Sequence, residues 1–223
     1  MTSLTQQLLY SPEVSIGLSP DTLVLIDKSR HKRNGTFINH TKWTRLPTGV
    51  WVLDFDGVDD AVTIPFDRST YNIPKMTICA WFNQREVKNQ RLINCWQALQ
   101  YDWLMSCPAG APQNRMVVGK GGNAGAASKI LPINTWYFAC ATLARNGANA
   151  DTSIYINGVF GASASAGTAV PVSGSAMVIG QPASLDNTLC WNGPIGKIDI
   201  YSYLLSAGQI LNLFESSRRL YGV

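Results

Sequence analysis

Glutamate and histidine are scarce in this chain: its 223 residues include three glutamates and two histidines. Glu13, Glu86 and Glu215 lie far apart in the sequence, so no two of them share a short catalytic motif. His31 and His40 both fall in an early loop region, and no serine-centred or cysteine-centred elbow supplies a partner for either. The sequence therefore predicts a protein that is not an enzyme.

Charge and long apolar runs are also in short supply. Charged residues make up 14% of the chain and the formal net charge is +4, which does not indicate a nucleic-acid partner. No apolar stretch approaches the ~20 residues that a membrane-spanning helix needs. The first twenty residues have neither the basic region nor the apolar core of a secretory signal. We therefore expect a soluble protein with no standard secretory signal and no membrane insertion.

Positive charge is concentrated in one place, KSRHKR at residues 28–33. The RNGT segment that overlaps its end is typical of a turn. The prediction is a solvated loop, with an anion-binding site as the alternative.

The five cysteines contain no CxxC pair, which argues against a zinc site. They are Cys79, Cys95, Cys107, Cys140 and Cys190. Cys79 and Cys140 lie inside apolar, strand-like runs, where a free thiol behaves as a small hydrophobic side chain. We predict that all five are reduced.

What the chain has in abundance is short β-type runs, about eleven of them, bounded by Gly, Pro, Asn or Asp. In SIYING, Ile154 and Ile156 point to one side of the strand, and Ser153 and Tyr155 to the other. With no helical periodicity between the runs, the pattern predicts two antiparallel sheets packed face to face.

One helix is predicted near the end, in SAGQILNLFESSRRL, with Ser206 as its N-cap. We find no internal repeat and no domain boundary within residues 21–223, which therefore form one domain. Residues 1–20 precede the first clear strand and are predicted to be an N-terminal arm.

The order of these motifs resembles the laminin G-like jelly roll of the concanavalin A-like lectin/glucanase superfamily, from about residue 22 to 217. The segments that carry the resemblance are LVLIDKSRHKRNGTFIN, WVLDFDGVDDAVTIP, MTICAWFN, WYFACATLARNGANADTSIYINGVF, MVIGQ and WNGPIGKIDIYSYLLSAGQILNLF. It implies an all-β jelly-roll sandwich of two antiparallel sheets with one short C-terminal helix. The fold hosts lectins, glycan-binding modules, glycosidases, adhesion domains and virion proteins, so function must be argued from a site. Members that cut β-glucans carry Glu-x-Asp-x-x-Glu on one strand, which the three separated glutamates cannot supply.

Four carboxylates crowd the segment LDFDGVDDAVTIP between two apolar runs. They are Asp54, Asp56, Asp59 and Asp60. Asp-Gly is typical of a tight turn, so the main prediction is a hairpin corner between two strands. The resemblance also implies a structural calcium ion in many relatives, and Ca²⁺ binds carboxylate and carbonyl oxygens. Asp56, Asp59, Asp60 and the carbonyl of Gly57 are the candidate ligands, and calcium is the only cofactor we consider.

A glycan site is predicted in the middle of the chain, where aromatic side chains alternate with polar ones. Sugar sites combine aromatic faces with hydrogen-bonding side chains at the rim. The candidates are Trp96, Tyr101, Asp102, Trp103, Arg115 and Asn123. For Trp96 and Trp103, a place in the hydrophobic core is the alternative.

The predicted arm carries apolar side chains that suit a docking segment. They are Leu8, Leu9, Tyr10, Val14 and Ile16. A lectin-like domain with such an arm and no secretory signal suits a protein loaded onto a particle inside a host cell, and similar domains occur among phage structural proteins. Our first expectation is a non-catalytic virion-surface protein, decorating a capsid or tail, with affinity for cell-surface glycans. Its partners would be other virion proteins or copies of itself. The alternative is a free carbohydrate-binding lectin, and a glycoside hydrolase comes third.

Overall fold

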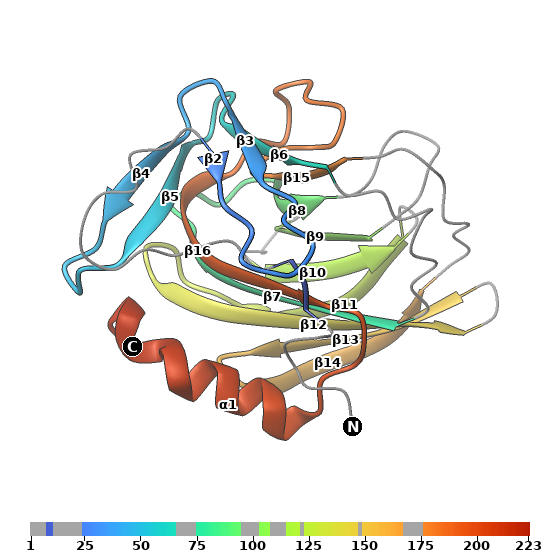
Figure 1. Cartoon of the computed structure of the whole chain (residues 1–223). Helices are drawn as coiled ribbons and strands as arrows, with labels where there is room; N and C mark the ends of the chain where they lie inside the picture. Colours follow the sequence, from blue (N-terminus) through green and yellow to red (C-terminus); the bar gives the residue numbers. More distant parts are fainter. Residues whose placement is uncertain are drawn as a thin grey trace.

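The chain folds into two eight-stranded antiparallel sheets packed face to face, which confirms the predicted jelly-roll sandwich (Figure 1). The structure is a computed structural model that describes residues 8–10, 24–65, 75–94, 103–107, 115–120, 123–146, 149–166 and 176–223. Sheet 1 has the order β14-β13-β12-β7-β16-β5-β4, with β1 also paired to β16. Sheet 2 has the order β11-β10-β9-β8-β15-β6-β3-β2.

The strand bounds follow the β-type runs of the sequence. Sheet 1 contains β1 (Leu8–Tyr10), β4 (Lys42–Arg45), β5 (Trp51–Asp56), β7 (Lys75–Asn83), β12 (Trp136–Asn146), β13 (Asn149–Ile156), β14 (Val159–Ala166) and β16 (Asn192–Tyr201). Sheet 2 contains β2 (Val24–Leu25), β3 (Gly35–Ile38), β6 (Ala61–Ile64), β8 (Gln90–Asn94), β9 (Trp103–Cys107), β10 (Arg115–Lys120), β11 (Asn123–Ile130) and β15 (Met177–Ile179).

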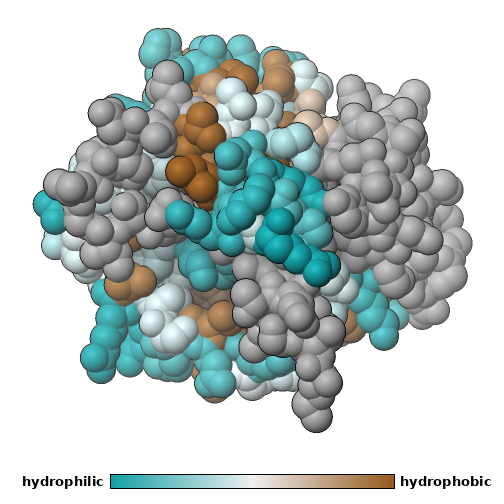
Figure 2. Space-filling model, in the orientation of Figure 1, coloured by the Kyte–Doolittle hydropathy of each residue, from teal (hydrophilic) through white to brown (hydrophobic). Residues whose placement is uncertain are grey.

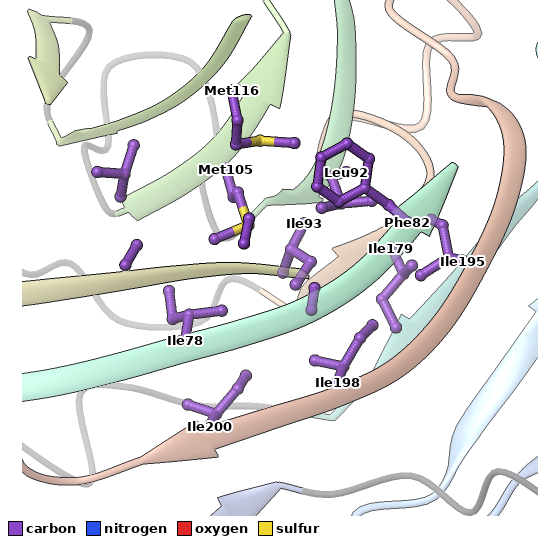
Figure 3. Close-up of a cluster of buried hydrophobic side chains, with 14 of the residues drawn as sticks. Ile78, Phe82, Leu92, Ile93, Met105, Met116, Ile179, Ile195, Ile198 and Ile200 are labelled. Atoms are coloured by element: carbon purple, nitrogen blue, oxygen red, sulfur yellow. The ribbon is translucent and has the colours of Figure 1, made fainter. Parts of the chain in front are cut away.

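The main hydrophobic core fills the space between the sheets. In Figure 3, Ile78 and Phe82 of β7 and Ile198 of β16 lie in one cluster with core residues of sheet 2. Those of sheet 2 include Ile93, Met105, Met116 and Ile179. Because alternate side chains of a strand point to opposite faces, residues 79 and 81 of β7 must point away from this core.

A second apolar cluster covers the outer face of sheet 1, where α1 (Ala207–Ser217) lies against the strands (Figure 1). Trp81 stacks on Tyr221 of the 3₁₀-helix Arg218–Tyr221 with ring centroids 4.2 Å apart, and its Nε1 donates to Ser217 Oγ at 3.0 Å. The predicted N-cap is confirmed, because Ser206 forms a capping box with Gln209. Since both faces of β7 are covered, its sequence reads as a continuous apolar run.

Tyr221 also completes an irregular stretch of β16. The register of β16 against β7 shifts between Ile195 and Ile198, and the backbone N–H of Lys197 donates to Tyr221 Oη at 2.8 Å. A Cβ atom at Gly196 would lie 2.7 Å from Cζ of the Tyr221 ring. Glycine is required at 196 because the ring occupies the space that a side chain would need.

Two of the described cysteines are joined by a disulfide. Cys79 and Cys140 are directly opposite each other on β7 and β12 and form a disulfide, so the prediction of five reduced cysteines is wrong for this pair. The buried Cys190 is a free thiol. Within the described residues, no helix is both long and apolar enough to cross a membrane.

The predicted N-terminal arm contributes a strand to the sandwich. In β1, Leu8 lies opposite Tyr201 and Tyr10 lies opposite Ile200 of β16. Val14 and Ile16 lie outside the described residues. The middle of the arm is thus paired within its own domain, and docking to a partner stays a prediction.

Candidate functional site

The acidic segment forms a turn that carries the chain from one sheet to the other. Asp56 Oδ1 accepts a hydrogen bond from the Val58 N–H at 2.8 Å, and Asp60 Oδ2 accepts from the Asp56 N–H at 2.9 Å. Gly57 has a φ of +83°, a backbone conformation that glycine adopts without steric cost. The turn prediction is confirmed. The hairpin is wrong, because β5 pairs with β4 and β16, whereas β6 pairs with β3 and β15.

The backbone carbonyls of this turn are already bound by donors from other parts of the chain. Lys88 Nζ donates to Gly57 O at 3.0 Å, and Cys190 Sγ donates to Val58 O at 3.0 Å. Asn39 Nδ2 donates to Asp59 O at 2.8 Å, and the Gln181 amide donates to the same oxygen. The turn is therefore held in place from several elements.

Three carboxylates of the turn lie close enough to share a cation. One oxygen each of Asp56, Asp59 and Asp60 lies within 4.8 Å of the others. Asp60 is 2% exposed, and its Oδ1 has no hydrogen-bond partner in the described part of the chain. Burial raises the pKa of the Asp60 carboxyl, and the negative charges of Asp56 and Asp59 raise it further.

These residues fit a calcium ion only in part. Ca²⁺ takes 6–8 oxygen ligands, so three carboxylates would leave several positions to water. The fourth predicted ligand, the Gly57 carbonyl, already accepts from the Lys88 ammonium group. Structural calcium at Asp56, Asp59 and Asp60 stays a prediction, with Lys88 as a competing cation.

A small cavity of about 160 Å³ lies beside the turn. Its lining residues are His40, Lys42, Asp54, Phe55, Asp56, Asp60 and Arg85. Arg85 Nη1 lies 2.7 Å from Asp54 Oδ1, so these two charges neutralise each other. Ligand pockets usually measure about 300–1,000 Å³, and we therefore place no sugar here.

The basic segment 28–33 is a loop organised by one buried carboxylate. Asp27, 0% exposed, accepts from the Ser29 N–H at 2.8 Å, from Ser29 Oγ at 2.7 Å and from the Arg33 N–H at 2.9 Å. Burial and the positive charges of Arg33 and Arg30 lower the pKa of His31. Figure 2 shows hydrophilic surface at the centre of the view, where Figure 1 draws the segment between β2 and β3. This geometry agrees with the solvated loop, and anion binding there stays a prediction.

The predicted glycan residues are only partly described. Trp96, Tyr101 and Asp102 lie outside the described residues, as do the side chains of Trp103 and Asn123. Backbone register places Trp103 and Asn123 on either side of Lys120, across β9, β10 and β11. Arg115 lies at the other end of β10, so the fold does not bring all the candidates to one point.

Arg115 lies on the outer face of sheet 2, and so does an arginine that the sequence did not indicate, Arg91. Met116 and Val118 belong to the core, so alternation turns Arg115 and Val117 away from it. Arg91 of β8 pairs with Ser106 of β9, which pairs with Val117. Arg91, Ser106 and Val117 are absent from the core between the sheets. Their side chains therefore lie on the outer face of sheet 2, as does that of Arg115.

This part of the outer face carries polar side chains beside Val117, and it is sheltered from water. Ser106 is 2% exposed, and Arg91 and Arg115 are half-buried. The Nε atoms of both arginines are buried and have no hydrogen-bond partner in the ranges that the structure describes. Burial lowers the pKa of the Arg91 guanidinium. The described residues thus leave N–H groups of both guanidinium groups without a hydrogen-bond acceptor.

The comparisons with known proteins agree with this architecture. A laminin G family model, described as the concanavalin A-like lectin/glucanases superfamily, matches residues 56–211. No curated protein matches the chain.

Solved structures of three proteins share the fold over nearly the whole chain. A Trypanosoma rangeli sialidase mutant with trans-sialidase activity has a TM-score of 0.70 and 17% identity, over 98% of this chain and 34% of its own. The binding domain of Paraclostridial Mosquitocidal Protein 1 has a TM-score of 0.69 and 16% identity, and the match covers 99% of this chain and 56% of that structure's chain. A structure of botulinum neurotoxin type C has a TM-score of 0.67 and 15% identity, and the match covers 96% of this chain and 52% of that structure's chain. Cell entry of this toxin is described as dependent on two ganglioside molecules. The chain thus spans between 34% and 56% of the length of these structures.

Proposed function

Because the chain belongs to the concanavalin A-like lectin/glucanase superfamily, we propose that it is a non-catalytic carbohydrate-binding module that binds glycans on the outer face of sheet 2. Two similar structures are described as binding domains, of Paraclostridial Mosquitocidal Protein 1 and of botulinum neurotoxin DC. Cell entry of botulinum neurotoxin type C is described as dependent on gangliosides, which are glycolipids. The outer face of sheet 1 is covered by α1, which leaves the outer face of sheet 2 as the sheet surface for a ligand.

The observation that carries the proposal is the polar character of a sheltered sheet face. A half-buried position on a strand normally holds an apolar side chain, because an unpaired polar group there loses hydration. Here β8 and β10 present Arg91 and Arg115 at half-buried positions, and β9 presents the buried Ser106 between them. A saccharide could compensate for the lost hydration, because its hydroxyl groups accept and donate hydrogen bonds.

The proposal that the module is non-catalytic is supported by the two described glutamates. Glu86 binds Lys88 at 3.3 Å in a loop after β7, and Glu215 binds Arg218 at 2.8 Å on α1. Retaining glycosidases need two carboxyl groups about 5–5.5 Å apart in the cleft. Asp60 is close to Asp56, but its Oδ2 accepts from the turn backbone and its side chain is buried.

A glycan array, followed by calorimetry on the strongest binders, tests the function. We expect binding in the wild type and a loss of at least about tenfold in affinity for Arg115→Ala, with the thermal midpoint preserved. Arg219→Ala is the matched control, because Arg219 is exposed and lies beyond sheet 1. The absence of any glycan binding would refute the proposal. Hydrolysis of a glycoside that disappears in Asp60→Asn would instead identify an enzyme.

A virion-surface role stays a prediction that none of the reported similarities supports. Its test is deletion of residues 1–20 with a measurement of particle incorporation. Because Leu8–Tyr10 pair with β16, the deletion must be compared with a variant that keeps β1 and changes only Val14 and Ile16 to serine. Loss of incorporation in the second variant, with stability unchanged, would support a docking arm.

A further inference from the structure

Arg91 and Arg115 differ from Arg85 and Arg218 in having no counter-charge among the described residues. Arg85 binds Asp54 at 2.7 Å, and Arg218 binds Glu215 at 2.8 Å. Neither Arg91 nor Arg115 takes part in an ion pair with any described residue, and the Nε of each is buried without a hydrogen-bond partner. Two guanidinium groups are therefore half-buried, and no described carboxylate neutralises them.

The sheet places these two groups where one ligand can reach both. Arg91 lies opposite Ser106, and Ser106 lies opposite Val117, two residues along β10 from Arg115. With strands about 4.8 Å apart and a rise of about 3.3 Å per residue, the two Cα atoms are about 12 Å apart. An arginine side chain extends over about half of that distance, so a saccharide lying across β9 could contact both.

A neutral sugar would satisfy the N–H groups but would leave the two positive charges in a sheltered place. An anionic group would accept hydrogen bonds from the N–H groups and also neutralise the positive charges. Guanidinium groups form short, paired, charge-assisted hydrogen bonds with carboxylate or sulfate groups. The formal net charge of +4 adds a general attraction for anions.

We propose that the glycan bound on the outer face of sheet 2 carries a carboxylate or sulfate group, which Arg91 and Arg115 hold across β9. The proposal rests on the proposed function, since it names the class of glycan for the same face.

The test uses polysaccharide pairs that differ in charge alone. Polygalacturonate is compared with its methyl ester, and dextran sulfate with dextran, by calorimetry on the full chain at low and moderate salt. We expect binding to at least one anionic member, at least about tenfold weaker binding to its neutral counterpart, and weaker binding at higher salt. The polygalacturonate and dextran pairs distinguish carboxylate from sulfate recognition.

Single substitutions of arginines then locate the site. Arg91→Gln and Arg115→Gln should each weaken anionic binding about tenfold, and Arg91→Lys should lose less because it keeps the charge. Arg219→Gln removes the same charge from an exposed position on the far side of sheet 1 and should change affinity less than twofold. Thermal unfolding confirms that each variant is folded, and if a glutamine variant does not fold, the lysine variants at both positions decide the test.

The outcomes separate the anionic class of the glycan from glycan binding itself. Equal binding of charged and neutral polysaccharides would overturn the anionic class and leave the module a glycan binder. Anionic binding that is unchanged in both arginine variants, or lost instead in Arg30→Gln of the basic loop, would also overturn it. Binding to no glycan at all would overturn the proposed function itself.

Discussion

Tyr221 allows a quantitative test of how the C-terminal segment stabilises sheet 1. Its hydroxyl accepts the backbone N–H of Lys197 at 2.8 Å, at the irregular stretch where β16 loses its register with β7. In Tyr221→Phe the ring stays and the acceptor disappears, so the Lys197 N–H is left without this partner. An unsatisfied buried donor costs about 1–3 kcal/mol, and because this N–H is only partly buried we expect about 1–2 kcal/mol.

The control is a second tyrosine on the same side of sheet 1. Tyr203 Oη is buried and has no hydrogen-bond partner among the described residues. Burial raises the pKa of both tyrosines, so both hydroxyls are neutral at ordinary pH. Tyr203→Phe removes a hydroxyl that makes no hydrogen bond, and we expect no loss of stability or a small gain.

Urea denaturation of the wild type and both variants, followed by tryptophan fluorescence, measures the difference. Equal free energies of unfolding for Tyr221→Phe and Tyr203→Phe would refute the role of the Lys197 hydrogen bond. A third variant tests the packing: Gly196→Ala should be strongly destabilising in the wild type. The same Gly196→Ala substitution should destabilise a Tyr221→Ala background much less, because the ring that the new Cβ would meet is gone.

The remaining predictions concern the acidic turn and the cysteines. Because the folded state raises the pKa of Asp60, ionising it costs stability as the pH rises from about 4 through the raised pKa. Asp60→Asn should therefore gain stability relative to the wild type at pH 7 and lose that gain at pH 4; a gain independent of pH would contradict the argument. Replacing Lys88 by Met removes the ammonium group from the turn, so millimolar calcium should raise the thermal midpoint of that variant more than that of the wild type. A larger calcium effect in the wild type would show that Lys88 does not compete. Cys190, with its pKa raised to about 11 by burial, should resist alkylation at pH 8 until the protein unfolds, and rapid labelling would contradict its buried position. A non-reduced digest of the same sample should contain a linked Cys79–Cys140 peptide, and separate peptides with alkylated thiols would argue against the disulfide.

The strands could be predicted because their apolar pattern is local. The runs MTICAWFN and WYFACATLA became β7 and β12, and their continuous apolar character follows from a core on one face and α1 on the other. The disulfide could not be predicted, because Cys79 and Cys140 are 61 residues apart and only the register of the two strands makes them opposite.

The acidic segment shows where local pattern stops being informative. Asp56 and Gly57 form the turn that their chemistry predicts. However, the same turn chemistry and the same alternation of Phe55 and Val62 toward the core suit a hairpin and a crossing between sheets equally well. The choice depends on which distant strands pair with β5 and β6, and this is a property of the whole fold.

Arg91 was missed for a related reason, and that reason explains why it is informative. In RLINCW it stands beside apolar residues, and a shift in register after Arg91 lets Leu92 and Ile93 both enter the core. The shift leaves Arg91 on the outer face beside Ser106, where nothing in the local sequence requires a charge. An apolar side chain there would avoid the cost of a half-buried, unpaired guanidinium, so Arg91→Leu should keep or raise the free energy of unfolding while it abolishes binding of anionic glycans. A loss of stability in that variant would mean that Arg91 serves the fold rather than a ligand.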